Sequence, residues 1–287
     1  MLHSGFGFAE LVASLAETLA GQARLPVDVA VLRNGLALAL GFSSLLAAQS
    51  GNSVTITSAA NATAGLAAES LATARGTGLA SQTAAAMSLP FPTSLAGVKI
   101  QVVDSQFVSR DAGLIFVSPT QINFEIPAET AAGPATVRID NGGPPIPVPV
   151  QIQKIAPALF SLNDLGVAAA TAVQVVIPTE IQSPVPVFQC FGTAAGCRLV
   201  PIALGIDTPV YLSFYGTGIR GRASVLTVRV RIGNVDIMAM YAGPQTQFPG
   251  LDQVNVPLPL ALRGAGDVNV TVTVDGVASN VVKINIL

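Results

Sequence analysis

One segment of this sequence occurs twice, and the repeat limits the folds that the chain can adopt. Ser118 to Pro127 is Ser-Pro-Thr-Gln-Ile-Asn-Phe-Glu-Ile-Pro, and Gly250 to Pro259 is Gly-Leu-Asp-Gln-Val-Asn-Val-Pro-Leu-Pro. In both copies a Gln-x-Asn triplet enters an alternating stretch that stops at a proline four residues after the Asn. Because alternation with a period of two is typical of a strand, we predict one β-rich module present in two copies.

Three further landmarks recur in the same order and at nearly constant spacing. Each module has a Gly-Thr-Gly corner, then an alternating strand, then an Ala-Gly pair ahead of the Gln-x-Asn strand. A strand with one buried and one solvated face must alternate in this way. The landmarks are Gly76 to Gly78, Val98 to Val103 and Ala112-Gly113 in the first module, and Gly216 to Gly218, Val225 to Ile232 and Ala242-Gly243 in the second.

Each module is predicted to close on a hairpin. Asn141-Gly142 and Asp275-Gly276 supply the positive φ angles that a tight hairpin turn needs. Four prolines remove hydrogen-bond donors near the returning strand of the first module, so we expect that strand at a sheet edge. The link between the modules, Ile155 to Phe160, is mostly apolar and is therefore expected to be packed. The four prolines are Pro144, Pro145, Pro147 and Pro149.

The composition favours an all-β fold. Of the 287 residues, 51% are hydrophobic and only 10% are charged, with 27 Gly and 20 Pro. Such a chain suits many short strands joined by tight turns and disfavours long solvated helices. We predict two tandem Ig-like (immunoglobulin/IPT-like) β-sandwich domains, at 52–155 and 156–287, after an N-terminal extension at 1–51. The likeness is one of shape, because the chain has no Trp for the Cys…Trp…Cys core of an antibody domain.

The N-terminal extension contains a segment that resembles a secretory signal. Arg33-Asn34 precedes an apolar segment from Gly35 to Leu46, and Ala47-Ala48 follows it. The favoured interpretation is a signal peptide at about 29–48 that is cleaved near Ala48, with translation starting near Val29 to Leu32. A short buried helix is the alternative. Export would place the mature protein outside the cell or on its surface.

Charge and hydropathy exclude two classes of partner. The net charge is −2, and the 14 basic residues are scattered along the chain. The sequence therefore has no cluster of basic residues that could neutralise a phosphate backbone. From residue 51 onward no apolar run reaches the roughly 18 residues that a spanning helix needs. We therefore expect no nucleic-acid partner and no membrane span in the mature chain.

Two cysteines, Cys190 and Cys197, lie in a loop of small residues. In an exported protein a disulfide between them is expected. Closing so short a loop should stabilise the protein by about 2 to 3 kcal/mol on the chain-entropy model. A zinc site would need four ligands, and the single histidine, His3, is remote in the sequence.

The segment from Pro184 to Leu199, around these cysteines, has no counterpart in the first module. Pro184, Pro186, Phe188 and Phe191 are expected to be exposed or half-exposed in it. The segment is predicted either to bind a partner, because a crosslinked loop loses less ordering entropy on binding, or only to cover an open end of the second sandwich.

The repeated amides have two interpretations. Gln121 with Asn123, and Gln253 with Asn255, place two amides on one face of a strand. They could bind the hydroxyl groups of a sugar, but such sites usually add an aromatic platform. Buried amides that tie the backbone of a neighbouring loop are favoured, and their presence in both modules points to this structural role.

Chemistry-bearing motifs are few. Asp104, Asp111, Glu125, Asp236 and Asp252 fall near predicted loops and could bind Ca²⁺, but no Asp-x-Asp-x-Asp-Gly series is present. We interpret them as solvated turn residues. We predict no catalytic residue, metal site or cofactor, because the sequence has no nucleophile elbow, phosphate-binding loop or paired-acid motif.

Several of these segments resemble a known family. Tyr211 to Arg222, Tyr241 to Gly243, Pro249 to Val256 and Val274 to Asn280 are similar to an Ig-like C-terminal domain of exported proteins from Solibacter and other Acidobacteria. Leu89 to Val98 and Ser118 to Asn123 carry the resemblance in the first module, so it covers residue 53 to the end. The resemblance implies an Ig-like secreted or surface module with no assigned activity.

Two functional hypotheses follow. The first is a non-enzymatic, secreted or cell-surface module for adhesion or for contacts with surface or matrix proteins. The alternative is a carbohydrate-binding accessory module. The expected partner is a protein or a glycan at the cell surface.

Overall fold

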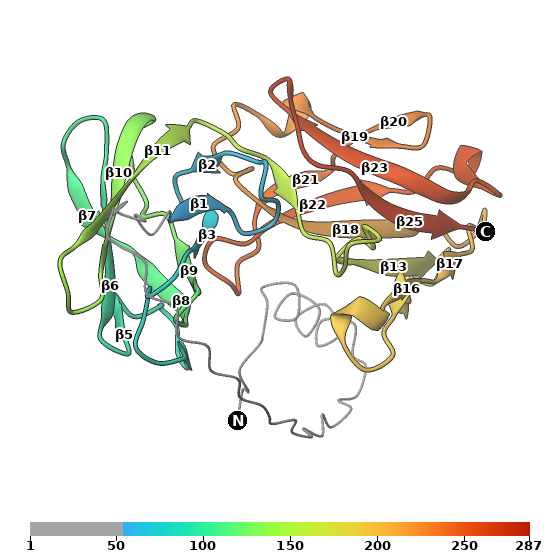
Figure 1. The fold of residues 1–287 in the computed structure, drawn as a ribbon. Coiled ribbons are helices and arrows are strands. Elements are labelled where there is room, and N and C mark those ends of the chain that lie inside the picture. The colour runs from blue at the N-terminus through green and yellow to red at the C-terminus, as the bar shows by residue number, and fades with distance from the viewer. Residues whose placement is uncertain (1–53) are drawn as a thin grey trace, which may run out of the picture.

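The computed structural model describes residues 54–287, and Figure 1 colours this part of the chain. The extension at 1–51, with its predicted signal segment and its proposed start near Val29, lies outside the described residues. The described chain consists of short, almost wholly antiparallel strands and a few 3-10 turns, so the all-β prediction is confirmed. Over residues 54–287 no helix has the length and apolar character needed to cross a membrane.

The first pair of sheets lies in the blue to green part of the chain (Figure 1). We call it the first module, residues 54–155. Sheet A has the order β1 (Thr55–Ser58), β3 (Leu71–Arg75), β9 (Gln121–Glu125), β8 (Gly113–Val117) and β4 (Ala84–Ala85). Sheet B has the order β2 (Leu66–Ala67), β11 (Ile146–Gln153), β10 (Gly133–Asp140), β6 (Val98–Val103) and β5 (Ser94–Leu95), with β7 (Ser109–Asp111) also pairing with β6.

The second pair of sheets lies in the yellow to red part of the chain (Figure 1). We call it the second module, residues 156–287. Sheet C has the order β14 (Ile181–Val185), β13 (Ala170–Val176), β18 (Val210–Thr217), β22 (Asp252–Pro257) and β21 (Tyr241–Pro244), and β12 (Ala158–Leu159) pairs with β18. Sheet D has the order β17 (Pro201–Ile202), β25 (Val282–Ile286), β23 (Gly266–Val274), β19 (Val228–Ile232) and β20 (Val235–Met238), and β24 (Val277–Ala278) pairs with β23.

The remaining elements are small. A two-stranded ribbon joins β15 (Phe188–Gln189) to β16 (Arg198–Leu199). The 3-10 turns are η1 (Ala194–Gly196), η2 (Val225–Thr227) and η3 (Leu260–Leu262).

The strand order of the first module is repeated in the second. In sheet A, β1-β3-β9-β8 has the same arrangement as β13-β18-β22-β21 in sheet C. In sheet B, β2-β11-β10-β6 corresponds to β17-β25-β23-β19 in sheet D, and β7 corresponds to β20. Even the parallel contact recurs, because β2 runs parallel to β11 and β17 runs parallel to β25. The duplication seen in the sequence is therefore also a duplication of topology.

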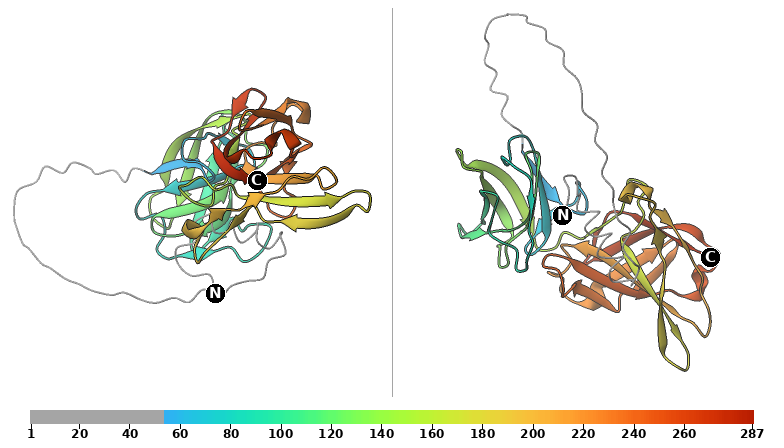
Figure 2. Two further views of the ribbon diagram at one scale, coloured as in Figure 1. Left: turned by 90° about the vertical axis from the view of Figure 1, so that its right-hand side faces the viewer. Right: turned by 90° about the horizontal axis from the view of Figure 1, so that it is seen from below.

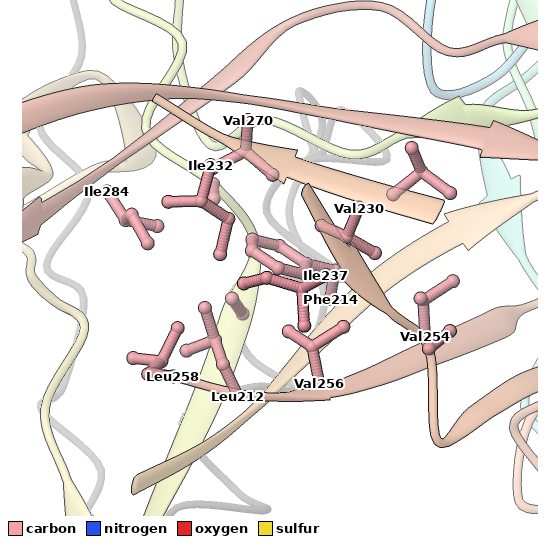
Figure 3. Close-up of a cluster of buried hydrophobic side chains, with 14 of the residues drawn as sticks. Leu212, Phe214, Val230, Ile232, Ile237, Val254, Val256, Leu258, Val270 and Ile284 are labelled. Atoms are coloured by element: carbon pink, nitrogen blue, oxygen red, sulfur yellow. The ribbon is translucent and has the colours of Figure 1, made fainter. Parts of the chain in front are cut away.

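Each module has its own hydrophobic core between its two sheets. In the first module, Ala72, Ile122 and Phe124 of sheet A pack in one cluster with Ile100 and Val137 of sheet B. In the second module, Figure 3 shows Leu212, Phe214, Val254 and Val256 of sheet C packed with Val230 and its neighbours from sheet D. In both cases alternate residues of each strand point inward, as their sequence pattern predicts.

The link between the modules is buried, as its apolar sequence indicated. Ile155, Ala156, Ala158, Leu159 and Phe160 are each at most 7% exposed. The link lies against the Gly-Thr-Gly corner, where a Cβ on Gly216 would come 2.5 Å from the carbonyl oxygen of Ala158. A Cβ on Gly218, whose φ is +74°, would come 2.2 Å from the carbonyl oxygen of Ala156. The second corner needs glycine because the link passes so close to it.

The predicted hairpin turns lie where the strands reverse. Gly142 has a φ of +89°, and its backbone N–H donates to the Asp140 carboxylate at 3.1 Å. Asn141 donates from its side chain to the carbonyl oxygen of Gly78 at 2.7 Å. Asp275 and Gly276 have φ angles of +46° and +85°. Their turn leads into the short strand β24, which was not predicted, and then into β25, which begins within one residue of the predicted return at Val281.

Two further expectations need correction. The stretch from Val225 begins as a 3-10 turn, not as a strand, because the Ser224 side chain accepts a hydrogen bond from the backbone of Leu226 at its start. The proline-rich strand β11 is not the last strand of its sheet, because β2 pairs with Ile152 and Gln153. The rest of β11, including its prolines, pairs only with β10.

Candidate functional site

In the first module the Gln-x-Asn amides form a side-chain ladder on sheet A. The Gln121 Nε2 donates to the Asn123 Oδ1 at 2.9 Å. The Thr73 hydroxyl, on the neighbouring strand β3, donates to the same oxygen at 3.0 Å. Arg75 donates to the Gln121 Oε1 at 2.9 Å. Asn123 is only 2% exposed.

The second module has the same ladder on sheet C, but it is more exposed. The Gln253 Nε2 donates to the Asn255 Oδ1 at 2.7 Å and approaches the Ser213 hydroxyl at 3.4 Å. Both amides are half-buried. In both modules these side-chain hydrogen bonds run to other side chains of the same sheet, so the predicted tie to a loop backbone is wrong. The structure does not bring the two ladders together, since they lie on different sheets.

The segment around the cysteines is part of a larger insertion. In the first module residues 59–65 connect β1 to β2, whereas residues 177–200 make the equivalent connection from β13 to β17. We call residues 177–200 the insertion. Its first part is the outer strand of the hairpin β13–β14, which projects from the second module in both views of Figure 2. Its second part is the ribbon β15–β16, closed by the disulfide between Cys190 and Cys197.

The insertion both covers and exposes apolar surface. Cys197 is fully buried in a third hydrophobic cluster with Phe160 and Leu162, and the Asn163 side chain donates to its carbonyl oxygen at 2.9 Å. Phe188 is half-buried against this cluster and against the core of the second module. Pro184, Pro186 and Phe191 are exposed. One part of the insertion therefore covers a hydrophobic cluster, and another part exposes apolar side chains to solvent.

The two modules meet at a buried contact that sequence reasoning missed. The Thr217 hydroxyl accepts from the backbone N–H of Leu71 at 2.8 Å and donates to the carbonyl oxygen of Gly250 at 2.8 Å. Gly250 has a φ of +77°, and a Cβ there would lie 2.4 Å from the Leu71 Cδ2. Nearby, the rings of Phe91 and Phe248 pack edge to face with centroids 5.8 Å apart.

Charged groups surround this contact. The Arg220 guanidinium donates to the Asp252 carboxylate at 2.8 Å, to the carbonyl oxygen of Leu251 at 2.8 Å and to Glu69 of the first module at 3.4 Å. The Asp252 carboxylate is fully buried and also accepts from the backbone of Ile219 at 2.7 Å. We call Glu69, Leu71 and Glu125 together with Thr217, Arg220, Gly250 and Asp252 the joint.

Burial raises the pKa of Glu125 to about 7, although the Arg220 charge opposes the shift and Glu69 and Asp252 add to it. Burial likewise raises the pKa of Asp252 against the opposing charge of Arg220. The joint thus gathers three carboxyl groups around one guanidinium. The four residues are far apart in the sequence, so no motif contains them. The one sequence signal that could have identified them is that charged residues are rare in this apolar chain.

The predicted interpretation of the acidic residues as solvated is wrong for two of them. Asp252 is fully buried, and Asp104 is 3% exposed. Of the five acids, only Glu125 and Asp252 come together, in the joint, whereas Asp104 pairs with Arg110 and Asp236 pairs with Arg231. Across residues 54–287, no group of three or more acidic, histidine or cysteine side chains is placed to hold a metal ion.

Asp104 organises the turn between β6 and β7. Its carboxylate accepts from the backbones of Gln106, Val108 and Ala131 at 2.9 to 3.1 Å, and from Arg110 at 2.6 Å. Burial raises the pKa of Asp104, but these hydrogen bonds outweigh burial and lower it to about 2. At the tip, Phe107 has a φ of +61° and is 88% exposed.

No protein-family model and no curated protein matches the chain, so the comparisons with known proteins assign it neither a family nor an activity.

Proposed function

We propose that the chain is a non-enzymatic module of the cell surface or extracellular matrix, acting in adhesion or in contacts with surface or matrix proteins. In this proposal the two modules are tandem Ig-like (immunoglobulin/IPT-like) sandwiches of the Acidobacterial family that the sequence resembles, exported through the signal-like segment. The repeated strand order, the separate cores and the buried link support the tandem sandwiches. Rigid scaffolds of this kind carry their binding residues on loops.

The observation that carries the proposal is the apolar surface of the insertion. Within it, Ile177, Ile181 and Phe191 are 53%, 59% and 65% exposed. Ile206, just outside it, is 72% exposed, and the backbone N–H of Ile177 donates to the carbonyl oxygen of the adjacent Asp207 at 2.9 Å. Ile177, Ile181 and Ile206 lie around the turn of the hairpin β13–β14, whereas Phe191 lies in the loop of the ribbon β15–β16. Exposed apolar residues of this size are typical of surfaces that bind another protein. The first module has no equivalent segment, so this surface is what the second copy adds.

A binding assay on the organism's own surface tests the proposal. The labelled full chain is expected to bind intact cells or their extracellular matrix. The double variant Ile181→Ser/Phe191→Ser removes two exposed apolar side chains and should bind at least about tenfold more weakly. Phe107→Ser is the control, because Phe107 is also a large, exposed apolar side chain but lies in the first module. Absence of binding, or equal weakening by the control, would contradict the proposal.

A further inference from the structure

All three tyrosines of the chain lie on one face of one sheet. In sheet C, alternate residues such as Leu212, Phe214 and Val254 point into the core of the second module. The residues between them point away from it, and these include Tyr211, Tyr215 and Tyr241. We call this the outer face of sheet C.

The outer face carries a continuous polar row beside these rings. Thr171, Ser213, Asn255 and Tyr241 lie directly opposite one another on four neighbouring strands. Tyr211 lies in the next row, opposite Pro257. From the spacing of strands and residues, Tyr211 and Tyr241 are about 12 Å apart at their backbones. This is about the length of a disaccharide.

The face is open between its two ends. Tyr211 and Tyr241 are each 37% exposed, and Asn255 is half-buried. At one end Tyr215 is 4% exposed, because it packs in the third hydrophobic cluster that includes Cys197. The part of the outer face that carries Tyr211, Ser213, Asn255 and Tyr241 is therefore accessible to a ligand that lies along the sheet.

Hydrogen-bonding capacity remains on this face. Asn255 accepts from Gln253 through its Oδ1, and its Nδ2 makes no side-chain hydrogen bond to any residue in the described chain. The Tyr211 hydroxyl likewise makes none within residues 54–287. Amide and hydroxyl groups of this kind exchange hydrogen bonds with sugar hydroxyls, while a tyrosine ring packs against the apolar C–H face of a pyranose.

Charge decides which ligand fits. The strand positions of the outer face named above carry no acidic or basic residue. Arg222 reaches the edge of the face from a loop, and its guanidinium lies beside the Tyr241 hydroxyl above Gly243. On the opposite side of the module, Arg229, Arg231 and Asp236 line a shallow hollow on sheet D, where Arg231 is paired with Asp236. The strand positions from Tyr211 to Asn255 are thus an uncharged part of the outer face, which favours a neutral ligand.

We propose that the outer face of sheet C is a binding site for a neutral, linear polysaccharide, seated across Tyr211 and Tyr241 and hydrogen-bonded by Ser213 and Asn255. This inference goes beyond the proposed protein contacts, because it names a different class of partner and uses Tyr211, Ser213 and Asn255 in place of the exposed apolar residues of the insertion. Sheet A cannot offer the same site, because Leu71, at the position of Tyr211, is fully buried in the joint.

Affinity electrophoresis of the full chain tests this site. Gels containing xylan, xyloglucan or glucomannan supply neutral probes, and a gel containing polygalacturonate supplies the anionic comparison. At least one neutral polysaccharide is expected to retard the protein, and polygalacturonate is not. Tyr211→Ala and Asn255→Ala should each weaken the retardation about tenfold. Tyr211 is the better first target, because the Tyr241 hydroxyl also holds the carbonyl oxygen of Pro244.

The controls separate this proposal from the proposed surface contacts. Met238→Ala, on sheet D, and the double variant Ile181→Ser/Phe191→Ser should both be retarded like the parent protein. Thermal unfolding of each variant shows whether it is folded. The proposal is overturned if no neutral polysaccharide retards the chain, if folded Tyr211→Ala and Asn255→Ala are retarded like the parent, or if polygalacturonate retards it equally.

Discussion

The outer faces of sheets A and C are built alike and used differently. Both carry a Gln-x-Asn ladder, and Leu71 on sheet A occupies the place that Tyr211 occupies on sheet C. Leu71 is fully buried against the second module, whereas Tyr211 is 37% exposed. The first copy of the repeat thus uses this face to dock its neighbour. In the second copy the same face carries exposed tyrosine and polar side chains.

The largest effect is expected from breaking the charge pair in the joint. Arg220→Met should destabilise the protein by about 3 to 5 kcal/mol, because it leaves the fully buried Asp252 carboxylate without its partner. Arg231→Met is the matched control in the same module. Its pair with Asp236 is exposed on both sides and screened by solvent, so little stability should be lost. Urea unfolding measures both, and equal losses would show that the joint does not depend on this pair.

A second test uses the close approach of backbone and side chain in the joint. Gly250→Ala should cost about 2 to 4 kcal/mol, because its methyl group would overlap Leu71 in addition to the strain of a positive φ. Gly264→Ala measures the strain alone. Gly264 has a φ of +73° and nothing within 4 Å of an added Cβ, so about 1 kcal/mol is expected. If Gly250→Ala breaks the contact between the modules, calorimetry should show two separate unfolding transitions. A single unchanged transition would mean that the joint does not couple the unfolding of the two modules.

The sequence predicted the parts of this fold that depend on local pattern. Alternation and the Gly-Thr-Gly corners identify the duplicated strands, and the apolar run from Ile155 correctly indicated a packed link. The local pattern gave a wrong strand boundary where one side chain altered it, as Ser224 does ahead of β19.

The joint and the outer face of sheet C could not be predicted in the same way. Arg220, Asp252 and Glu69 meet only because the second module folds back on sheet A, and no spacing in the sequence encodes that approach. The three tyrosines were visible in the composition, but their common face depends on the register between β18 and β21 through β22. The amide pairs were identified correctly as a repeated feature, yet their partners required the positions of Thr73 and Ser213 on the neighbouring strands.

A third test uses pH. The pKa of Glu125 is raised from 4.5 to about 7, so the folded state keeps a proton that the unfolded state releases between these values. The stability that this proton confers is complete below about pH 4.5 and is lost as pH rises through about 7. Because Glu125 is partly exposed, we expect a decline of only about 1 to 2 kcal/mol between pH 5 and pH 8.

Glu125→Gln should flatten this decline, since its side chain stays neutral at every pH. Glu69, Asp252 and Arg220 face the same space and remain in place, so the variant isolates the one carboxyl group. The carboxyl group of Asp104 affects stability in a different pH range. Its lowered pKa contributes stability above 3.8 that is lost as pH falls through about 2. A decline between pH 5 and pH 8 that persists in Glu125→Gln would assign the pH dependence to another group.

The smallest effect compares the repeated amides directly. Asn123→Ala removes the acceptor that Gln121 and Thr73 share in a buried position, so about 1 kcal/mol of stability should be lost. Asn255→Ala removes the equivalent acceptor in the second module, where water can replace it, and about 0.5 kcal/mol is expected. Parallel urea titrations of the two variants measure the difference. If the two variants lost equal stability, the Asn255 amide would stabilise sheet C as much as the Asn123 amide stabilises sheet A. A small loss of stability, together with a loss of polysaccharide retardation, would instead show that Asn255 contributes to binding more than to the stability of sheet C.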